Sequence, residues 1–247
     1  MKLYIARISY GDDPLHTNRL IQLCLRLSQL GIPFHLAEPL WDSLIPRGRN
    51  RVARKFLETS DCTHLLNIDS DIIFQPWDVE RLISANLDFV GAPYPLKGHN
   101  LSPSVVGSLI ADGERRDGFL EAGDIGTGFL LLSRAVFDAL APHAAKYSTD
   151  IVGDPSTREI EFYGCGVEDA LREDSQYLSE DWWISRAWRA TGGKCWLDGE
   201  AKLGHTGRNV WMMGQSLNEG LRAAVPEDCT CKTAIGALCP EHNKGQR

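Results

Sequence analysis

The first 68 residues alternate between short apolar runs and longer segments with apolar residues at helical spacing. Residues 3–10 mix β-branched and aromatic side chains and predict a first strand, and residues 32–37 and 64–68 predict two more. Between them, residues 14–30 and 47–59 carry the apolar spacing of amphipathic helices. A strand–helix–strand–helix–strand order predicts an α/β sheet with parallel strands.

The third predicted strand ends on Asp69-Ser70-Asp71. In open α/β sheets, ligands bind beyond the carboxyl ends of the strands, so this acidic pair lies where a ligand is expected. One reading is a polar turn, because Asp often caps turns after strands. The other is a metal site, in which two carboxylates hold Mn²⁺ or Mg²⁺ and the cation neutralises a leaving diphosphate. The pair alone leaves both readings open.

The rest of the chain alternates less regularly. Two extended segments follow a helix at residues 78–86, and a buried strand at 128–133 feeds a helix at 135–140. Residues 142–177 carry little periodicity and predict a long loop near the site. A helix at 180–191 and strands at 194–197 and 201–205 close the pattern.

Length and charge limit the classes of function. A chain of 247 residues has room for one sizeable core. The 26 basic and 33 acidic residues give a net charge of −7, which argues against non-specific binding to nucleic acid. A nucleic acid as the acceptor of a reaction stays an open alternative. No run approaches the roughly 20 apolar residues of a spanning helix, and Arg7 interrupts any apolar signal core. We therefore expect a cytoplasmic, or intracellular and virus-encoded, protein.

Two segments late in the chain supply candidate catalytic and metal-binding groups. In YLSEDWWISRAW, Ser179 and the acids suit a helix start, yet a carboxylate there can also act as a base facing a crevice. Asp181 is the first candidate base and Glu180 the second. In LGHTG, His205 ends an extended segment before a turn; such a residue is usually structural, but its imidazole is also a good ligand for Mn²⁺-class ions.

Two further segments supply candidate donor contacts. Arg47, Asn50 and Arg51 fall on one predicted helix face near its start, where phosphate and nucleobase contacts are favourable, although such residues often only solvate a helix. In AGDIGTGFLLLSRAVF, the glycines flanking Thr127 either relieve crowding or let the backbone approach a ligand. We predict donor contacts from Gly126 and Thr127.

Taken together, RNRVARKFLETSDCTHLLNIDSDI, GAPYPLK, GDIGTGFLLLSRAVF, SEDWWISRAW and LGHTG resemble a GT-A glycosyltransferase over roughly residues 3–210. The resemblance implies a Rossmann-like α/β domain, which we assign to residues 1–215, with a mixed, mostly parallel central sheet flanked by helices. The chain departs from the family in its Cys-rich tail, residues 216–247. It implies a nucleotide-sugar donor, usually a UDP-sugar.

The resemblance also implies roles for single residues. Asp69 would contact the ribose and the metal, Asp71 would ligate the metal, and His205 would complete the metal or diphosphate site. Asp181 matches the base of inverting members. Ser9 and Tyr10 occupy the expected nucleobase position.

The favoured function is transfer of a sugar to an acceptor hydroxyl, with inversion. A nucleotidyl- or pyrophosphorylase-type enzyme also needs acids and a metal, but the chain lacks an early Gly-rich phosphate loop. A non-catalytic module that binds a nucleotide-sugar or nucleic acid is the alternative from another class. The acceptor stays open among a glycan, a small molecule, a protein and a hydroxymethylated DNA base.

The tail carries C-x-C-x7-C-x2-H, formed by Cys229, Cys231, Cys239 and His242. Tetrahedral Zn²⁺ takes Cys₃His sets, so a small structural zinc knuckle is expected. The alternative is free thiols on a frayed end.

Overall fold

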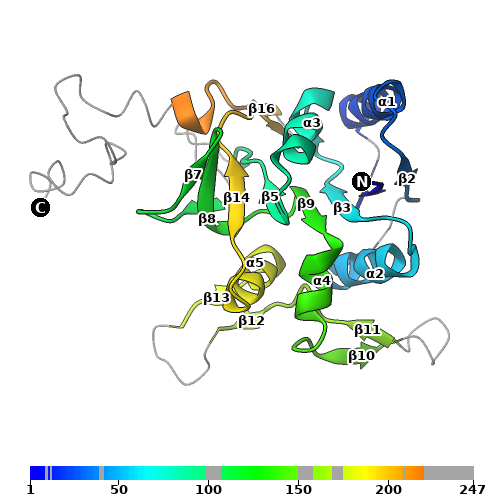
Figure 1. Cartoon of the computed structure of the whole chain (residues 1–247), viewed down its shortest axis with the longest axis vertical. Helices are drawn as coiled ribbons and strands as arrows, with labels where there is room; N and C mark the ends of the chain where they lie inside the picture. Colours follow the sequence, from blue (N-terminus) through cyan, green and yellow to red (C-terminus); the bar gives the residue numbers. More distant parts are fainter. Residues whose placement is uncertain are drawn as a thin grey trace, which may run out of the picture.

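A nine-stranded mixed sheet forms the centre of the molecule, with helices on both of its faces (Figure 1). The computed structural model describes residues 1–8, 11, 13–38, 42–97, 107–149, 158–168, 175–207 and 210–219. The strands follow the order β2 (Phe34–Leu36), β1 (Leu3–Ala6), β3 (His64–Ile68), β9 (Phe129–Ser133), β5 (Phe89–Gly91), β14 (Cys195–Asp198), β8 (Phe119–Ile125) and β6 (Gly107–Leu109), and β7 (Arg115–Arg116) also pairs with β8.

The described strands of this sheet run in one direction except β8 and β9, which are antiparallel to each of their neighbours. Parallel pairing joins β1 to β2, β1 to β3 and β5 to β14. The prediction of a mixed, mostly parallel sheet within an α/β fold is therefore confirmed. The antiparallel insertion of β9 between β3 and β5 was not predicted.

Alternation along β1 explains how one sheet supports two apolar layers. Leu3 and Ile5 face α1 (Pro14–Gln29) and α3 (Pro76–Ala85), whereas Tyr4 and Ala6 face the opposite layer. That second layer contains α2 (Ile45–Glu58), α4 (Arg134–Leu140) and α5 (Glu180–Ala190), on the other side of the sheet in Figure 1. The inner parallel strands β1, β3, β5 and β14 are buried on both faces, as expected for a sheet covered by helices, whereas the edge strand β2 is largely exposed.

The helices begin where local sequence satisfies their free amide groups. Asp13 accepts hydrogen bonds from the amides of Leu15 and His16 at the start of α1. Gln75 and Asp78 form a reciprocal capping box at the start of α3. Both helices also have proline in the first turn, where its missing N–H costs nothing.

Three segments differ from the sequence predictions. β1 ends at Ala6, and Ser9 and Tyr10 lie outside the described residues. The predicted long loop at 142–177 contains two small antiparallel sheets, β10 (Lys146–Ser148) with β11 (Arg158–Ile160) and β12 (Gly166–Val167) with β13 (Tyr177–Leu178). Strands this short carry too little periodicity to be recognised in a sequence.

The structure also contains a separate three-stranded sheet that the sequence did not predict. It consists of β4 (Ile72–Ile73), β15 (Gly204–Thr206) and β16 (Val210–Met212). β15 pairs with β4 so that His205 lies opposite Ile72. This pairing places His205 beside Ile72, the residue that follows Asp71.

The packed body continues into the start of the predicted tail. Ser216 and Asn218 are buried, and the Asn218 amide donates to the carbonyl oxygen of Gly199 at 2.8 Å. The four predicted zinc ligands Cys229, Cys231, Cys239 and His242 lie outside the described residues. Within the described part of the chain, no helix is both long and apolar enough to cross a bilayer.

Candidate active site

Asp71 and His205 come together because β15 pairs with β4 directly after the Asp-Ser-Asp turn. The Thr206 amide donates to the Asp71 carbonyl oxygen at 2.7 Å and fixes the register. His205 Nε2 then lies 3.2 Å from Asp71 Oδ2. Two of the three predicted metal-binding residues are therefore neighbours.

The second nitrogen of His205 determines how its ring faces Asp71. His205 Nδ1 lies 2.8 Å from the Pro95 carbonyl oxygen, which can only accept, so Nδ1 carries the hydrogen. Nε2 of such a neutral ring would present a lone pair to a carboxylate oxygen. A cation, either a proton or a metal ion, is therefore needed between Nε2 and Asp71. A histidine held by a backbone carbonyl in this way has the geometry of a metal ligand.

Lys97 is a second cation at Asp71, where its ammonium group donates to Oδ2. Burial alone would raise the pKa of Asp71, but the hydrogen bonds from His205 and Lys97 outweigh it and lower the pKa to about 2. The Asp71 carboxylate is consequently ionised at any physiological pH. Lys97 lies in GAPYPLK, and sequence reasoning did not single it out as a site residue.

Asp69 is oriented away from this pair and toward Arg49. Arg49 Nη2 lies 2.8 Å from Asp69 Oδ2, and Arg49 Nε lies 3.3 Å from Glu180 Oε1. The Arg49 side chain is only 3% exposed. Burial would lower its pKa, but the two carboxylates outweigh burial and raise it. Arg49 therefore joins the end of β3 to the start of α5.

Arg49 was missed as a site residue, although the sequence contains a signal for it. It shares the inner face of α2 with Val52, Ala53 and Phe56, at offsets of 3, 4 and 7. An arginine in an apolar stripe needs buried partners, because an unpaired buried charge is very unfavourable. That requirement points to acids at the neighbouring strand ends.

Two buried polar atoms of this bridge are unsatisfied. Arg49 Nη1 and Asp69 Oδ1 have no hydrogen-bond partner among the described residues. Buried groups of this kind are normally paired, so each unpaired one calls for a physical explanation. Asp69 Oδ1 is a free anionic oxygen at the strand end, which suits a cation or a donor group of a ligand.

Gly128 packs beneath Asp69 rather than facing a ligand. Its carbonyl oxygen accepts from the Asp69 amide at 2.9 Å, and its own amide donates to the Tyr94 hydroxyl at 3.2 Å. A Cβ at this position would lie 2.8 Å from that hydroxyl. Close packing therefore requires glycine here. The neighbouring Gly126 and Thr127 are buried between β8 and β9, and Thr127 Oγ1 donates to Glu180 Oε1 at 3.4 Å.

The two candidate bases differ in their contacts. Glu180 is held by Arg49 and Thr127, whereas Asp181 Oδ1 accepts from its own helix start, from the Ser179 hydroxyl and from the Trp182 amide at 2.9 Å. Burial raises the pKa of Asp181 above its usual range, and the neighbouring Glu180 adds to the effect. A carboxylate of raised pKa is the stronger base while it remains ionised.

The predicted donor face on α2 is divided by the structure. Arg47 and Arg51 are half-buried and pair with Asp42, at 2.7 and 3.7 Å. Asn50 is buried and binds the backbone of Tyr163, accepting from its amide at 2.8 Å and donating to its carbonyl oxygen at 3.0 Å. The three side chains do not share one open surface, so a nucleotide contact from this group stays a prediction.

No group of three or more His, Cys, Asp or Glu side chains is gathered as a metal site in the described ranges. Two cavities of the described surface also lie elsewhere, one between α4 and α5 and one beside the first residues of β5 and β14. The strand-end cluster therefore consists of two charge groups, Asp71 with His205 and Lys97, and Asp69 with Arg49 and Glu180.

No protein-family model matches the chain, and no curated protein matches it. Among solved structures, A197 from STIV is similar at 16% identity, with a TM-score of 0.49, over 88% of this chain and 96% of that one. A glycosyltransferase involved in the glycosylation of the major capsid of PBCV-1 is similar at 13% identity, with a TM-score of 0.33, over 56% of this chain and 63% of that one. At these TM-scores, neither likeness indicates an activity or a substrate for this chain.

Proposed function

We propose that this protein is a glycosyltransferase that moves a sugar from a nucleotide-sugar, first of all a UDP-sugar, to an acceptor hydroxyl. One observation carries the proposal: Asp71, His205 and Lys97 meet beside Asp69 at the carboxyl end of β3. Ligands of open α/β sheets bind at such strand ends. Carboxylates, an imidazole and an ammonium group together suit a metal-bound diphosphate.

The residues present fit Mn²⁺ or Mg²⁺. Asp71 Oδ2 and His205 Nε2 face each other at 3.2 Å, and Asp69 Oδ1 is a buried anionic oxygen without a partner among the described residues. Mg²⁺ usually takes one or two carboxylates and completes its shell with water and phosphate oxygens, so a gathered three-residue cage is not required. When bound, the cation would supply positive charge to the departing diphosphate.

The chain's own residues would orient and deprotonate the reactants. Arg49 holds Asp69 and Glu180 in fixed relative positions. Asp181 would accept the acceptor proton, since its pKa is raised while its helix start keeps it oriented. In-line attack by the acceptor on the anomeric carbon would then invert its configuration.

Asp181→Asn is expected to lower kcat by about 100-fold while leaving nucleotide affinity unchanged, because only proton transfer is lost. In the native enzyme, kcat should fall as the pH drops through the raised pKa of Asp181, since the protonated acid cannot accept a proton. Steady-state kinetics against pH measure both effects. Glu180→Gln is the matched variant: a larger loss there, with Asp181→Asn active, would move the base to Glu180.

The activity itself is tested with a panel of nucleotide-sugars, each with Mn²⁺ and with EDTA. Release of UDP that requires Mn²⁺ is the expected result, in water alone and faster with an acceptor present. Release of pyrophosphate from a nucleoside triphosphate would instead support the nucleotidyltransferase alternative. Tight nucleotide-sugar binding with no turnover of any donor would instead support the alternative of a non-catalytic binding module.

The tail would bind a structural zinc ion through Cys229, Cys231, Cys239 and His242. Four protein ligands leave no open position, so this zinc would stabilise the segment rather than react. Elemental analysis of protein purified without chelator should find close to one equivalent of zinc, lost from a Cys231→Ser, Cys239→Ser double variant. Three freely titratable thiols with no zinc would contradict the proposal.

A further inference from the structure

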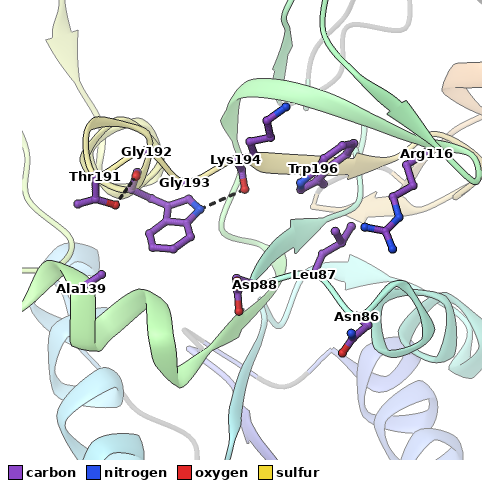
Figure 2. A pocket seen from close by; sticks show the side chains of 11 residues that line it. Asn86, Leu87, Asp88, Arg116, Ala139, Thr191, Gly192, Gly193, Lys194 and Trp196 are labelled. Carbon is purple, nitrogen blue, oxygen red and sulfur yellow. Dashed lines mark hydrogen bonds between the residues drawn. The ribbon is translucent and has the colours of Figure 1, made fainter.

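A second pocket lies at the opposite edge of the sheet from Asp69. Its walls include Asn86, Leu87 and Asp88, which precede β5, and Gly192, Gly193 and Lys194, which precede β14 (Figure 2). β5 and β14 run parallel to β3, and Asp69 follows the carboxyl end of β3. The pocket is therefore at the amino ends of the parallel strands. Its volume of about 540 Å³ lies within the usual range of small-molecule sites, roughly 300–1,000 Å³.

Two hydrogen-bond donors that line this pocket have no partner in the part of the chain that the structure describes. Trp196 is only 5% exposed, yet its indole N–H has no acceptor among the described residues, and in Figure 2 the indole nitrogen points toward the middle of the lining residues. The indole nitrogen is not itself a buried unpaired atom, so its N–H opens toward the cavity. The Arg116 guanidinium likewise has no ion pair within the described chain. Both groups are available to acceptor atoms of a ligand.

An acceptor and apolar surfaces complete the walls. Asp88 Oδ1 accepts from the Ser133 hydroxyl at 2.6 Å, which orients the carboxylate and leaves its other oxygen available. Leu87, Ala139 and the ring of Trp188 supply the apolar surface. Trp188 is held in place, because its N–H donates to the Lys194 carbonyl oxygen at 3.1 Å and it lies against Gly193. A Cβ at Gly193 would come within 2.0 Å of Trp188, so glycine is required for this wall.

The chemistry of the walls excludes several ligand classes. An apolar ligand would bury Arg116, Asp88 and the Trp196 N–H without partners, which is unfavourable. A phosphate group would face the Asp88 carboxylate, and a cation would face Arg116. A neutral ligand with hydroxyl groups that both donate and accept, and with an apolar C–H face for an indole, satisfies all of these groups at once. A pyranose ring has these properties.

We propose that this pocket binds a neutral hexose unit of a glycan, on the edge of the sheet opposite the strand-end cluster. Arg116 and the Trp196 N–H donate to ring hydroxyl oxygens, Asp88 accepts from a hydroxyl group, and Trp188 lies beside the C–H face. The site would retain a glycan chain on the protein without taking part in a reaction. It does not depend on the transfer activity proposed above.

The test is saturation-transfer NMR with the methyl glycosides of glucose, galactose, mannose and N-acetylglucosamine. UDP and Mg²⁺, a diamagnetic ion that leaves the glycoside signals sharp, are present in excess, so that a nucleotide-sugar site is blocked. At least one glycoside should give a signal, with the millimolar affinity expected of so small a ligand. Trp196→Phe and Arg116→Gln should each weaken binding about fivefold, the effect of losing one hydrogen bond.

The controls separate binding from folding. Trp77→Phe removes a tryptophan that is 59% exposed on α3, outside this pocket, and should leave binding unchanged. Arg116 lies on the exposed strand β7, so Arg116→Gln keeps the test decisive even if Trp196→Phe folds poorly. The proposal is overturned if no glycoside binds, or if binding is equal in Arg116→Gln and native protein. It is also overturned if uridine or inorganic phosphate occupies the pocket more tightly than every glycoside.

Discussion

Asp71→Asn is expected to reduce kcat/KM for sugar transfer by about a thousandfold, because the loss of several kcal/mol of charge stabilisation at a diphosphate has this effect. The substitution preserves the size of the side chain and removes its charge. Asp71 contacts both His205 and Lys97. Without the carboxylate, a metal ion would lose a ligand and Lys97 would lose its ion-pair partner. Steady-state kinetics with the best donor measure the loss, and calorimetry should show that Mn²⁺ no longer strengthens UDP binding.

Asp138→Asn is the matched control, since Asp138 is exposed on α4, away from the site. Its kinetics should equal those of the native protein. The fold of Asp71→Asn should survive, because Asp71 is 37% exposed and its ion pairs are partly screened. The stabilising effect of Asp71 is complete above its unfolded pKa of about 3.9 and is lost only as the pH falls through about 2. Full activity of Asp71→Asn at neutral pH would remove the Asp-Ser-Asp turn from the mechanism.

The fold was predictable where a segment is long or strictly periodic. The strand at residues 64–68 and the helix that begins at Pro14 appear as predicted. Strands of two or three residues, such as β4 and β12, were not recognised, because their pairing depends on the rest of the fold rather than on their own side chains. Neither β7 nor β8 was predicted as a strand. They form a hairpin whose turn is Asp117-Gly118, where both residues have positive φ.

The candidate site was predictable only in part, for a related reason. The sequence placed Asp71 at a strand end, and the pairing of β15 with β4 brings His205 to it. The roles of Arg49 and Lys97 depend on contacts between distant segments, 20 residues away for Asp69 and 26 residues away for Asp71. Asp69 is oriented toward Arg49 because a buried guanidinium requires an anion. A sequence shows that requirement but not which acid meets it.

Loss of Arg49 should reduce stability strongly. Its guanidinium is buried and bonds both Asp69 and Glu180, so Arg49→Met would leave two partly buried carboxylates facing each other without a cation. Removal of one partner from a buried ion pair typically costs about 3–5 kcal/mol. That amount is a large fraction of the roughly 5–15 kcal/mol by which domains are stable. We therefore expect the free energy of unfolding of Arg49→Met to fall by about 3–5 kcal/mol.

Urea denaturation of three variants tests this role. Arg49→Lys keeps the charge, but a single ammonium group cannot reproduce the two-sided guanidinium contact, so we expect an intermediate loss of stability. The double variant Arg49→Met, Glu180→Gln removes one of the two stranded charges and should recover part of the stability lost in Arg49→Met. Such a recovery measures the coupling between Arg49 and Glu180, since the residues are in contact. If Arg49→Met were as stable as the native protein, or if the two losses simply added, Arg49 would not be the cation that joins β3 to α5.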